Sequence, residues 1–138
     1  VARARQYADK LGYDLVIVDK KREKANESQV MNIIGDVKGK DVILVDDMVD
    51  TAGTLVKAAE VLKEKGANSV MACCTHGVLS GPAYDRVANG VLDELVISDT
   101  IQTKKKAKKI TVLTASTIIG EAIRRIHNNE SVNSIFNN

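Results

Sequence analysis

Short apolar runs alternate with helical patterns along most of the chain, and this alternation restricts the possible folds more than any other feature. Apolar runs typical of buried strands are found at residues 13–18, 41–45, 69–75, 94–98 and 110–114, with a weaker one at 29–35. Helical patterns are found at residues 2–11, 52–65, 82–90 and 115–128. Because strands that alternate with helices form parallel sheets covered by those helices, the sequence predicts an α/β fold with a mostly parallel sheet flanked by helices. The 138 residues are enough for one such domain.

The composition excludes several classes of protein. Charges are nearly balanced, with 20 basic and 18 acidic residues, and aromatic residues make up 3% of the chain. Proteins that bind single-stranded nucleic acid usually stack bases on aromatic side chains, so we expect no nucleic-acid partner. No apolar run approaches the roughly 20 residues of a membrane span, so we expect no membrane partner. Cys73 and Cys74 have no second cysteine pair or histidine cluster beside them, which predicts reduced thiols of a cytoplasmic protein and no metal site.

The stretch VILVDDMVDTAGTL, residues 42–55, concentrates acidic and hydroxyl side chains where a predicted strand leads into a predicted helix. The apolar run ends at Val45, directly before Asp46 and Asp47. A helix N-cap needs one Asp or Thr, and a tight turn needs one glycine, so capping would explain Gly53 and one polar residue. It does not explain two adjacent carboxylates, which repel each other and are unfavourable without a partner. This pattern favours a ligand site over a cap.

The two parts of this stretch suit two parts of one ligand. Small residues let backbone N–H groups surround a phosphate at a helix N-terminus, and Thr51 and Thr54 add hydroxyl donors. Ionised carboxylates only accept hydrogen bonds, so Asp46 and Asp47 suit a pair of donors such as the cis-diol of a ribose. The turn has neither the G-x-x-x-x-G-K-[ST] nor the G-x-G-x-x-G phosphate motif. The residues therefore predict a site for ribose 5-phosphate.

The same stretch, VILVDDMVDTAGT, resembles the phosphoribosyl-diphosphate motif of the type I phosphoribosyltransferase fold. Four further stretches resemble the carboxyl-terminal half of ribose-phosphate diphosphokinase, and together the similarity extends over essentially all 138 residues: VDKKREKANE, MNIIGDVKGKDVILVDDMVDTAGT, CCTHGVLSGPAYDRV and GEAIRRIHNNESVNSIF. The resemblance implies that residues 1–138 are a single phosphoribosyltransferase-like domain. It would be one half of a two-domain synthetase whose amino-terminal half is absent here.

The resemblance also implies a reaction and its participants. Such enzymes transfer the diphosphoryl group of ATP to the C1 hydroxyl of ribose 5-phosphate, giving phosphoribosyl diphosphate and AMP. The implied cofactor is Mg²⁺, with its ligands and much of the ATP pocket mainly in the other half, and the implied assembly is a homo-oligomer. We therefore expect the chain to be inactive by itself.

Individual roles follow from the resemblance, position by position. Asp46 and Asp47 are expected to bind the ribose hydroxyls. The 5-phosphate is expected on a loop made of Asp50, Thr51, Ala52, Gly53 and Thr54.

Two further segments match family positions outside this turn. Lys20 and Arg22 match the catalytic basic pair of a flexible loop, and Asn26 lies where that loop meets ATP. Near the end of the chain, three positions match the surroundings of an allosteric nucleotide site: Ser131, Val132 and Phe136.

Two other functions use the same residues differently. A phosphoribosyltransferase would bind preformed phosphoribosyl diphosphate at the same acidic turn, and a non-catalytic regulatory subunit of the synthetase would keep the fold alone. The basic run DKKR directly after the strand at 13–18 favours diphosphoryl transfer over the first. The presence of Lys20, Arg22, Asp46 and Asp47 argues against the second.

Overall fold

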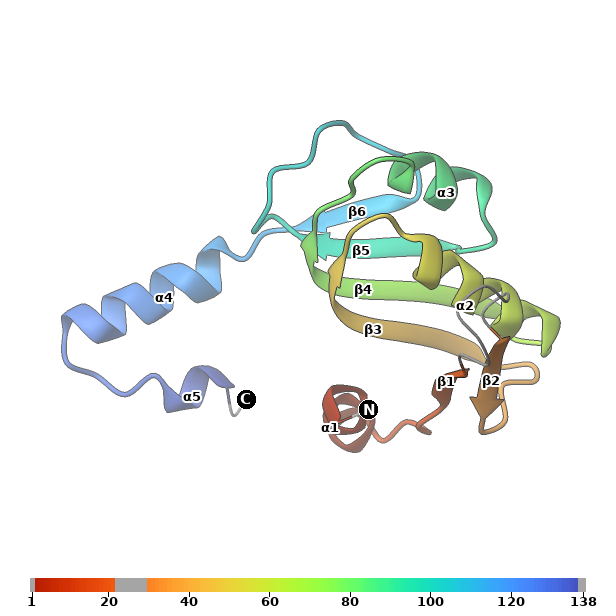
Figure 1. Cartoon of the computed structure of the whole chain (residues 1–138). Helices are drawn as coiled ribbons and strands as arrows, with labels where there is room; N and C mark the ends of the chain where they lie inside the picture. Colours follow the sequence, from red (N-terminus) through yellow and green to blue (C-terminus); the bar gives the residue numbers. More distant parts are fainter. Residues whose placement is uncertain (1, 22–29, 137–138) are drawn as a thin grey trace.

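A four-stranded parallel sheet forms the centre of the molecule in a computed structural model, which describes residues 2–21 and 30–136 (Figure 1). The strand order is β3-β4-β5-β6, with neighbouring strands parallel throughout. The strands are β3 (Asp41–Val49), β4 (Ser69–Gly77), β5 (Glu94–Ser98) and β6 (Ile110–Leu113). The predicted α/β class with a parallel sheet and flanking helices is confirmed.

The main hydrophobic core lies between this sheet and two helices, α2 (Gly53–Glu64) and α3 (Ala83–Asn89), which pack on the same face (Figure 1). From the sheet, Val70, Leu95 and Ile97 are fully buried, and Leu62 of α2 packs into the same cluster. Burying one such side chain stabilises the fold by about 1.5–3 kcal/mol. This core fixes the direction of each strand and so the position of the loops at the carboxyl ends.

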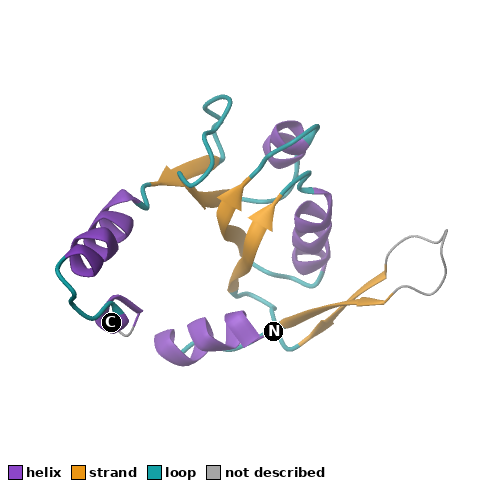
Figure 2. Cartoon of the chain, turned by 60° about the vertical axis from the view of Figure 1, so that its left-hand side comes forward, coloured by secondary structure: helices purple, strands orange, loops and turns teal. Residues whose placement is uncertain are grey.

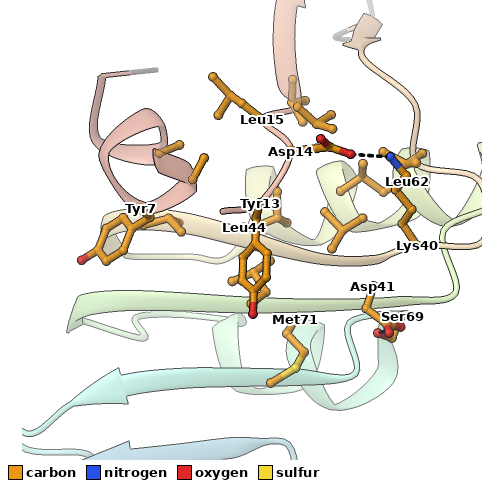
Figure 3. Close-up of a pocket in the computed structure, with 18 of the residues that line it drawn as sticks. Tyr7, Tyr13, Asp14, Leu15, Lys40, Asp41, Leu44, Leu62, Ser69 and Met71 are labelled. Carbon is orange, nitrogen blue, oxygen red and sulfur yellow. Dashed lines mark hydrogen bonds and ion pairs between the residues drawn. The ribbon is translucent and has the colours of Figure 1, made fainter. Parts of the chain in front are cut away.

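The other face of β3 and β4 borders a cavity of about 830 Å³ whose opposite wall is α1 (Ala2–Leu11). Its lining is mainly apolar and includes Tyr7, Tyr13, Leu44 and Met71 (Figure 3). An ion pair with 2.7 Å between the Asp14 carboxylate and the Lys40 ammonium connects the segment after α1 to the residue before β3. This contact with Lys40 lowers the pKa of Asp14.

A separate antiparallel hairpin is formed by β1 (Ile17–Lys21) and β2 (Val30–Ile34), as Figure 2 shows. The prediction that residues 13–18 form a strand of the main sheet is therefore wrong, because the strand begins at Ile17 and pairs with β2. The physical reason is the short connection. Parallel pairing needs a crossover of roughly a dozen residues or more, and Lys21 at the end of β1 is too close in sequence to Val30 at the start of β2 for that.

The last segments extend beyond β6, where α4 (Ser116–His127) is followed by α5 (Asn133–Phe136) (Figure 1). All residues of α4 are described, and none is buried. The short helix α5 was not predicted from the sequence. Every helix in the described part of the chain is too short or too polar to cross a lipid bilayer.

Candidate functional site

The two adjacent carboxylates lie inside a strand and not at its end. β3 continues past Val45 to Val49, with Asp46 opposite Cys74 and Met48 opposite His76 on β4. The prediction that the strand stops before Asp46 is therefore wrong. β3 is one of the two edge strands of the sheet, and charged side chains are tolerated on an edge because they remain exposed to water.

The pleat of β3 separates the two carboxylates, because successive strand residues point to opposite sides of a sheet. Asp46 lines a cavity of about 510 Å³, and Asp47 is not among the residues of its wall. An Asp46 carboxylate oxygen also accepts the backbone N–H of Asp47 at 2.9 Å. The other walls of this cavity come from Leu15–Val18 and from the turn that follows β3.

The turn between β3 and α2 has an unusual backbone. Ala52 is in the left-handed region, with φ of 59°, and only 5% of its surface is exposed. It is the N-cap residue of α2, and no side chain bonds the helix end from there. The first N–H groups of a helix have no partner within the helix, and the helix dipole is positive at this end. The turn therefore offers backbone donors to an anion, and the capping interpretation of its polar residues is not supported.

The turn is held by the loop that follows β4. The backbone N–H groups of Val78 and Leu79 both donate to the carbonyl of Val49, at 3.0 and 3.1 Å. Ser80 bonds Asp50 twice, with its N–H on the carbonyl at 3.1 Å and its hydroxyl on the carboxylate. One predicted phosphate-loop residue, Asp50, is thus engaged with the protein itself.

Arg86 of α3 also contacts the turn, with 2.9 Å between its Nη1 and the carbonyl oxygen of Thr51. A methyl group in place of the Gly53 hydrogen would lie 3.1 Å from the same nitrogen. Sequence reasoning placed a helix at residues 82–90 but gave Arg86 no role. Its spacing from the turn, 35 residues along the chain, leaves no local pattern that would reveal the contact.

The predicted basic loop begins beside this cavity. Leu15–Val18 line the cavity, and Lys20 follows on the same strand, β1. Arg22 and Asn26 lie outside the described residues. The structure therefore brings residues 15–18, which precede the basic segment, and the acidic turn to one cavity.

The predicted allosteric residues lie elsewhere. Ser131 and Val132 connect α4 to α5, and Phe136 ends α5 with 70% of its surface exposed. The Ser131 carbonyl accepts a hydrogen bond from Arg125 at 3.1 Å. These residues follow β6, while the acidic turn follows β3 at the opposite edge of the sheet.

Side chains that could bind a metal do not cluster within the ranges 2–21 and 30–136. No three His, Cys, Asp or Glu side chains in these ranges cluster closely enough to hold an ion. Both cysteines are free thiols. Burial raises the pKa of Cys74 to about 11 and also raises that of Cys73, so both are neutral at physiological pH.

A parallel sheet, a separate antiparallel hairpin and a small-residue turn between β3 and α2 define a phosphoribosyltransferase-type α/β fold. Comparison with known proteins is more specific. The family model of the phosphoribosyl synthetase-associated domain matches residues 15–137, so the chain belongs to that family.

Several relatives are similar over nearly the whole chain. The ribose-phosphate pyrophosphokinases of Campylobacter jejuni and Helicobacter pylori strain J99 are 69% and 59% identical to it over 99% of its length. The crystal structure of phosphoribosylpyrophosphate synthetase from Mycobacterium smegmatis matches 94% of the chain with 37% identity and a TM-score of 0.83.

The chain spans less than half of these relatives: 44% and 43% of the two enzymes and 43% of the crystallised chain. Neither these shares nor the family description names the half to which the chain corresponds. The predicted carboxyl-terminal position is therefore not confirmed.

Proposed function

We propose that this chain is part of a ribose-phosphate pyrophosphokinase and that the cavity between β1 and the β3–α2 turn binds ribose 5-phosphate. The observation that carries the proposal is the common lining of this cavity, where Asp46 lies with residues 50–54. The C1 hydroxyl oxygen would attack the β-phosphorus of ATP. The bond from that phosphorus to the bridging oxygen breaks, AMP leaves with the oxygen, and the hydroxyl proton passes to solvent.

The turn would bind the 5-phosphate through its backbone. The first N–H groups of α2 are not bonded within the helix, and the N-cap residue Ala52 adds no side-chain bond. The hydroxyls of Thr51 and Thr54 are on exposed residues and supply further donors. A phosphate is a fitting ligand because it accepts several N–H bonds at the positive end of the helix dipole.

The carboxylates would have different tasks. Asp46 lines the cavity and would accept the hydrogen bonds of the ribose hydroxyls there. Asp47, on the opposite side of the pleat, would reach the sugar only from the strand edge, so we give it the smaller share of the binding.

The basic segment after β1 would act on the phosphates of ATP. Lys20 and Arg22 would stabilise the negative charge that develops between the α- and β-phosphorus atoms, and Asn26 would contact ATP. The support for these roles is the resemblance, together with the position of Val18, which lines the cavity two residues before Lys20.

Carboxylate oxygens are ligands that Mg²⁺ accepts, and it usually binds one or two of them together with substrate phosphates. The described residues contain no cluster of three donor side chains. As the resemblance implies, the ligands of Mg²⁺ would lie mainly in the other half of the synthetase, and the bound ion would neutralise phosphate charge. The allosteric role of the tail residues and the homo-oligomeric assembly stay predictions.

Binding of ribose 5-phosphate to the full-length protein that contains this chain tests the proposal. Asp46→Asn removes a charge-assisted hydrogen bond and should weaken binding roughly 10- to 100-fold by titration calorimetry. Asp47→Asn should weaken it less, and Asp85→Asn, on an exposed residue of α3, should not change it. Unchanged affinity in Asp46→Asn would contradict the assignment of the sugar site.

Product analysis separates the alternatives. The proposed enzyme forms AMP from ATP and ribose 5-phosphate, and we expect the 138-residue chain by itself to form none. A phosphoribosyltransferase would instead consume phosphoribosyl diphosphate and a base, and a regulatory subunit would do neither. The names of the relatives favour the first activity.

A further inference from the structure

We propose that Arg86 is a positioning residue for the turn between β3 and α2. Its guanidinium would hold the backbone of this turn from the protein side, in the conformation from which the first amides of α2 bind phosphate. This inference rests on the proposed function of the turn and assigns a task to a residue outside it.

The contacts of Arg86 converge on the peptides that lead into α2. Its Nη1 donates to the carbonyl oxygen of Thr51 at 2.9 Å. A Cβ added to Gly53 would lie 3.1 Å from Nη1 and 3.6 Å from Cζ of the same guanidinium. The guanidinium therefore bonds the Thr51 carbonyl and lies beside the Cα of Gly53, whose hydrogen in place of a side chain leaves it the space.

The turn requires such external support because of its backbone. Ala52 has a left-handed conformation, which is unfavourable for any residue with a Cβ. Leu79, in the loop that bonds Val49, is also left-handed, with φ of 49°. Residues in such conformations persist where surrounding contacts determine them, and they concentrate at ligand-binding positions. Ser80 secures the turn at Asp50, and Arg86 secures it at Thr51.

Positioning and charge make different predictions for this arginine. If Arg86, on α3, contributed only positive charge near the phosphate, a cation on α2 itself would contribute similarly. Lys57 is such a cation, with 3.2 Å between its ammonium and the carboxylate of Glu60 and half of its side chain exposed. If Arg86 acts through its bond to the Thr51 carbonyl, only Arg86 should affect the sugar phosphate.

The first test uses the full-length protein that contains this chain. Arg86→Ala should raise the KM for ribose 5-phosphate roughly tenfold, the size expected for one charge-assisted hydrogen bond, and leave the KM for ATP unchanged. Added guanidinium ion should restore part of the loss, and Lys57→Ala should behave like the unmodified protein. Equal effects of Arg86→Ala and Lys57→Ala would overturn the proposal, and so would no effect of Arg86→Ala.

A second test begins with a variant that keeps Arg86. Gly53→Ala keeps Arg86 but displaces its guanidinium, and alanine itself is a good helix residue at this position. We expect it to raise the KM for ribose 5-phosphate with circular dichroism unchanged. In the Arg86→Ala background the further effect of Gly53→Ala should largely disappear, since the displaced group is no longer there.

The outcomes distinguish this inference from the proposed function. If Gly53→Ala is equally harmful with and without Arg86, the glycine is needed by the ligand and the positioning role is overturned, while the sugar site stands. If the unmodified full-length protein does not bind ribose 5-phosphate in calorimetry, the proposed function fails and this inference fails with it.

Discussion

The helices α2 and α4 are both 12 residues long and both have an apolar stripe, yet they have opposite surroundings. Along α2, Ala58, Ala59 and Leu62 are buried against the sheet. Along α4, all of which is described, no residue is buried, although isoleucine occurs four times on it: Ile118, Ile119, Ile123 and Ile126. An amphipathic pattern therefore predicts that a helix forms, whereas the position of a partner surface decides whether its apolar side is buried.

The polar contacts of the two helices differ in the same way. At the last turn of α2, Lys63 pairs with Asp93 at 3.0 Å and so connects the helix to the segment before β5. On α4, Arg124 and Arg125 pair with Glu121 of the same helix, and Arg124 also pairs with Glu130 just beyond it. The Lys63–Asp93 contact of α2 thus connects distant parts of the domain, whereas these contacts of α4 stay within the helix and the segment that directly follows it.

Truncation of one large side chain on each helix should give the largest contrast. Leu62→Ala removes a fully buried side chain and should lower the free energy of unfolding by about 2–5 kcal/mol. Ile123 is 63% exposed, and Ile123→Ala should change that free energy by less than about 0.5 kcal/mol. Urea unfolding of the two variants beside the unmodified chain measures both values. Losses of similar size would show that α4 is buried in solution.

Acidification should affect the ion pair between α2 and Asp93 differently from the ion pairs of α4. The Val70 N–H, at 2.7 Å, and the Lys63 ammonium lower the pKa of Asp93. A carboxyl whose pKa is lower in the folded state stabilises it above the unfolded pKa of about 3.9, and this stabilisation is lost as the pH falls through the folded pKa. Asp93→Asn should therefore lower the free energy of unfolding by about 1 kcal/mol near neutral pH, a modest amount because the carboxylate is half exposed. It should also weaken the dependence of that free energy on pH in the acid range.

Glu121→Gln is the matched control on α4. Arg124 and Arg125 lower the pKa of Glu121 to about 2, so its pairs persist in moderate acid. All of these partners lie on α4, so this substitution should alter local helicity, measured by NMR chemical shifts, and leave the urea midpoint unchanged. Parallel stability profiles for Asp93→Asn and the unmodified chain would contradict the contrast.

The smallest expected effect concerns the two thiols of β4. Cys74 is buried on the side covered by α2, and its pKa of about 11 leaves roughly one thiolate in a thousand near pH 8. Cys73 lines the cavity beside α1 and is only partly buried. Iodoacetamide labelling followed by peptide mass spectrometry should modify Cys73 first, and Cys74 at a rate that follows unfolding. Equal labelling rates would show that the two faces of the sheet are equally accessible.

Much of the central fold was predictable because each element shows its own periodicity. The strand at 94–98 was predicted with its observed bounds, and the helix predicted at 52–65 begins one residue later and ends one residue earlier. Pairing was less predictable, since the antiparallel partner of β1 depends on the short connection and not on the apolar run itself. The end of β3 was misplaced because charge normally ends a buried strand, whereas this strand lies at an edge.

The candidate site was predictable where its residues are consecutive. The adjacency of Asp46 and Asp47 to the small-residue turn is visible in the sequence, and the structure joins Asp46 and the turn in one cavity. Arg86 and Ser80 were missed because they reach the turn from a different segment, through backbone carbonyls and one carboxylate. Only the three-dimensional packing of α3 and its preceding loop brings them there.

The cavity and the β1–β2 hairpin share residues, since Ile17 and Val18 belong to both. Suppose that a ligand binds the cavity more tightly when the whole hairpin is in one position relative to the sheet than in another. It then shifts the population of molecules toward the first position by the difference between the two binding free energies. Thermodynamic reciprocity then requires that whatever fixes the hairpin changes the affinity of the cavity by the same factor. Contacts that hold the hairpin in the position favoured by a cavity ligand would therefore raise the affinity of the cavity for that ligand.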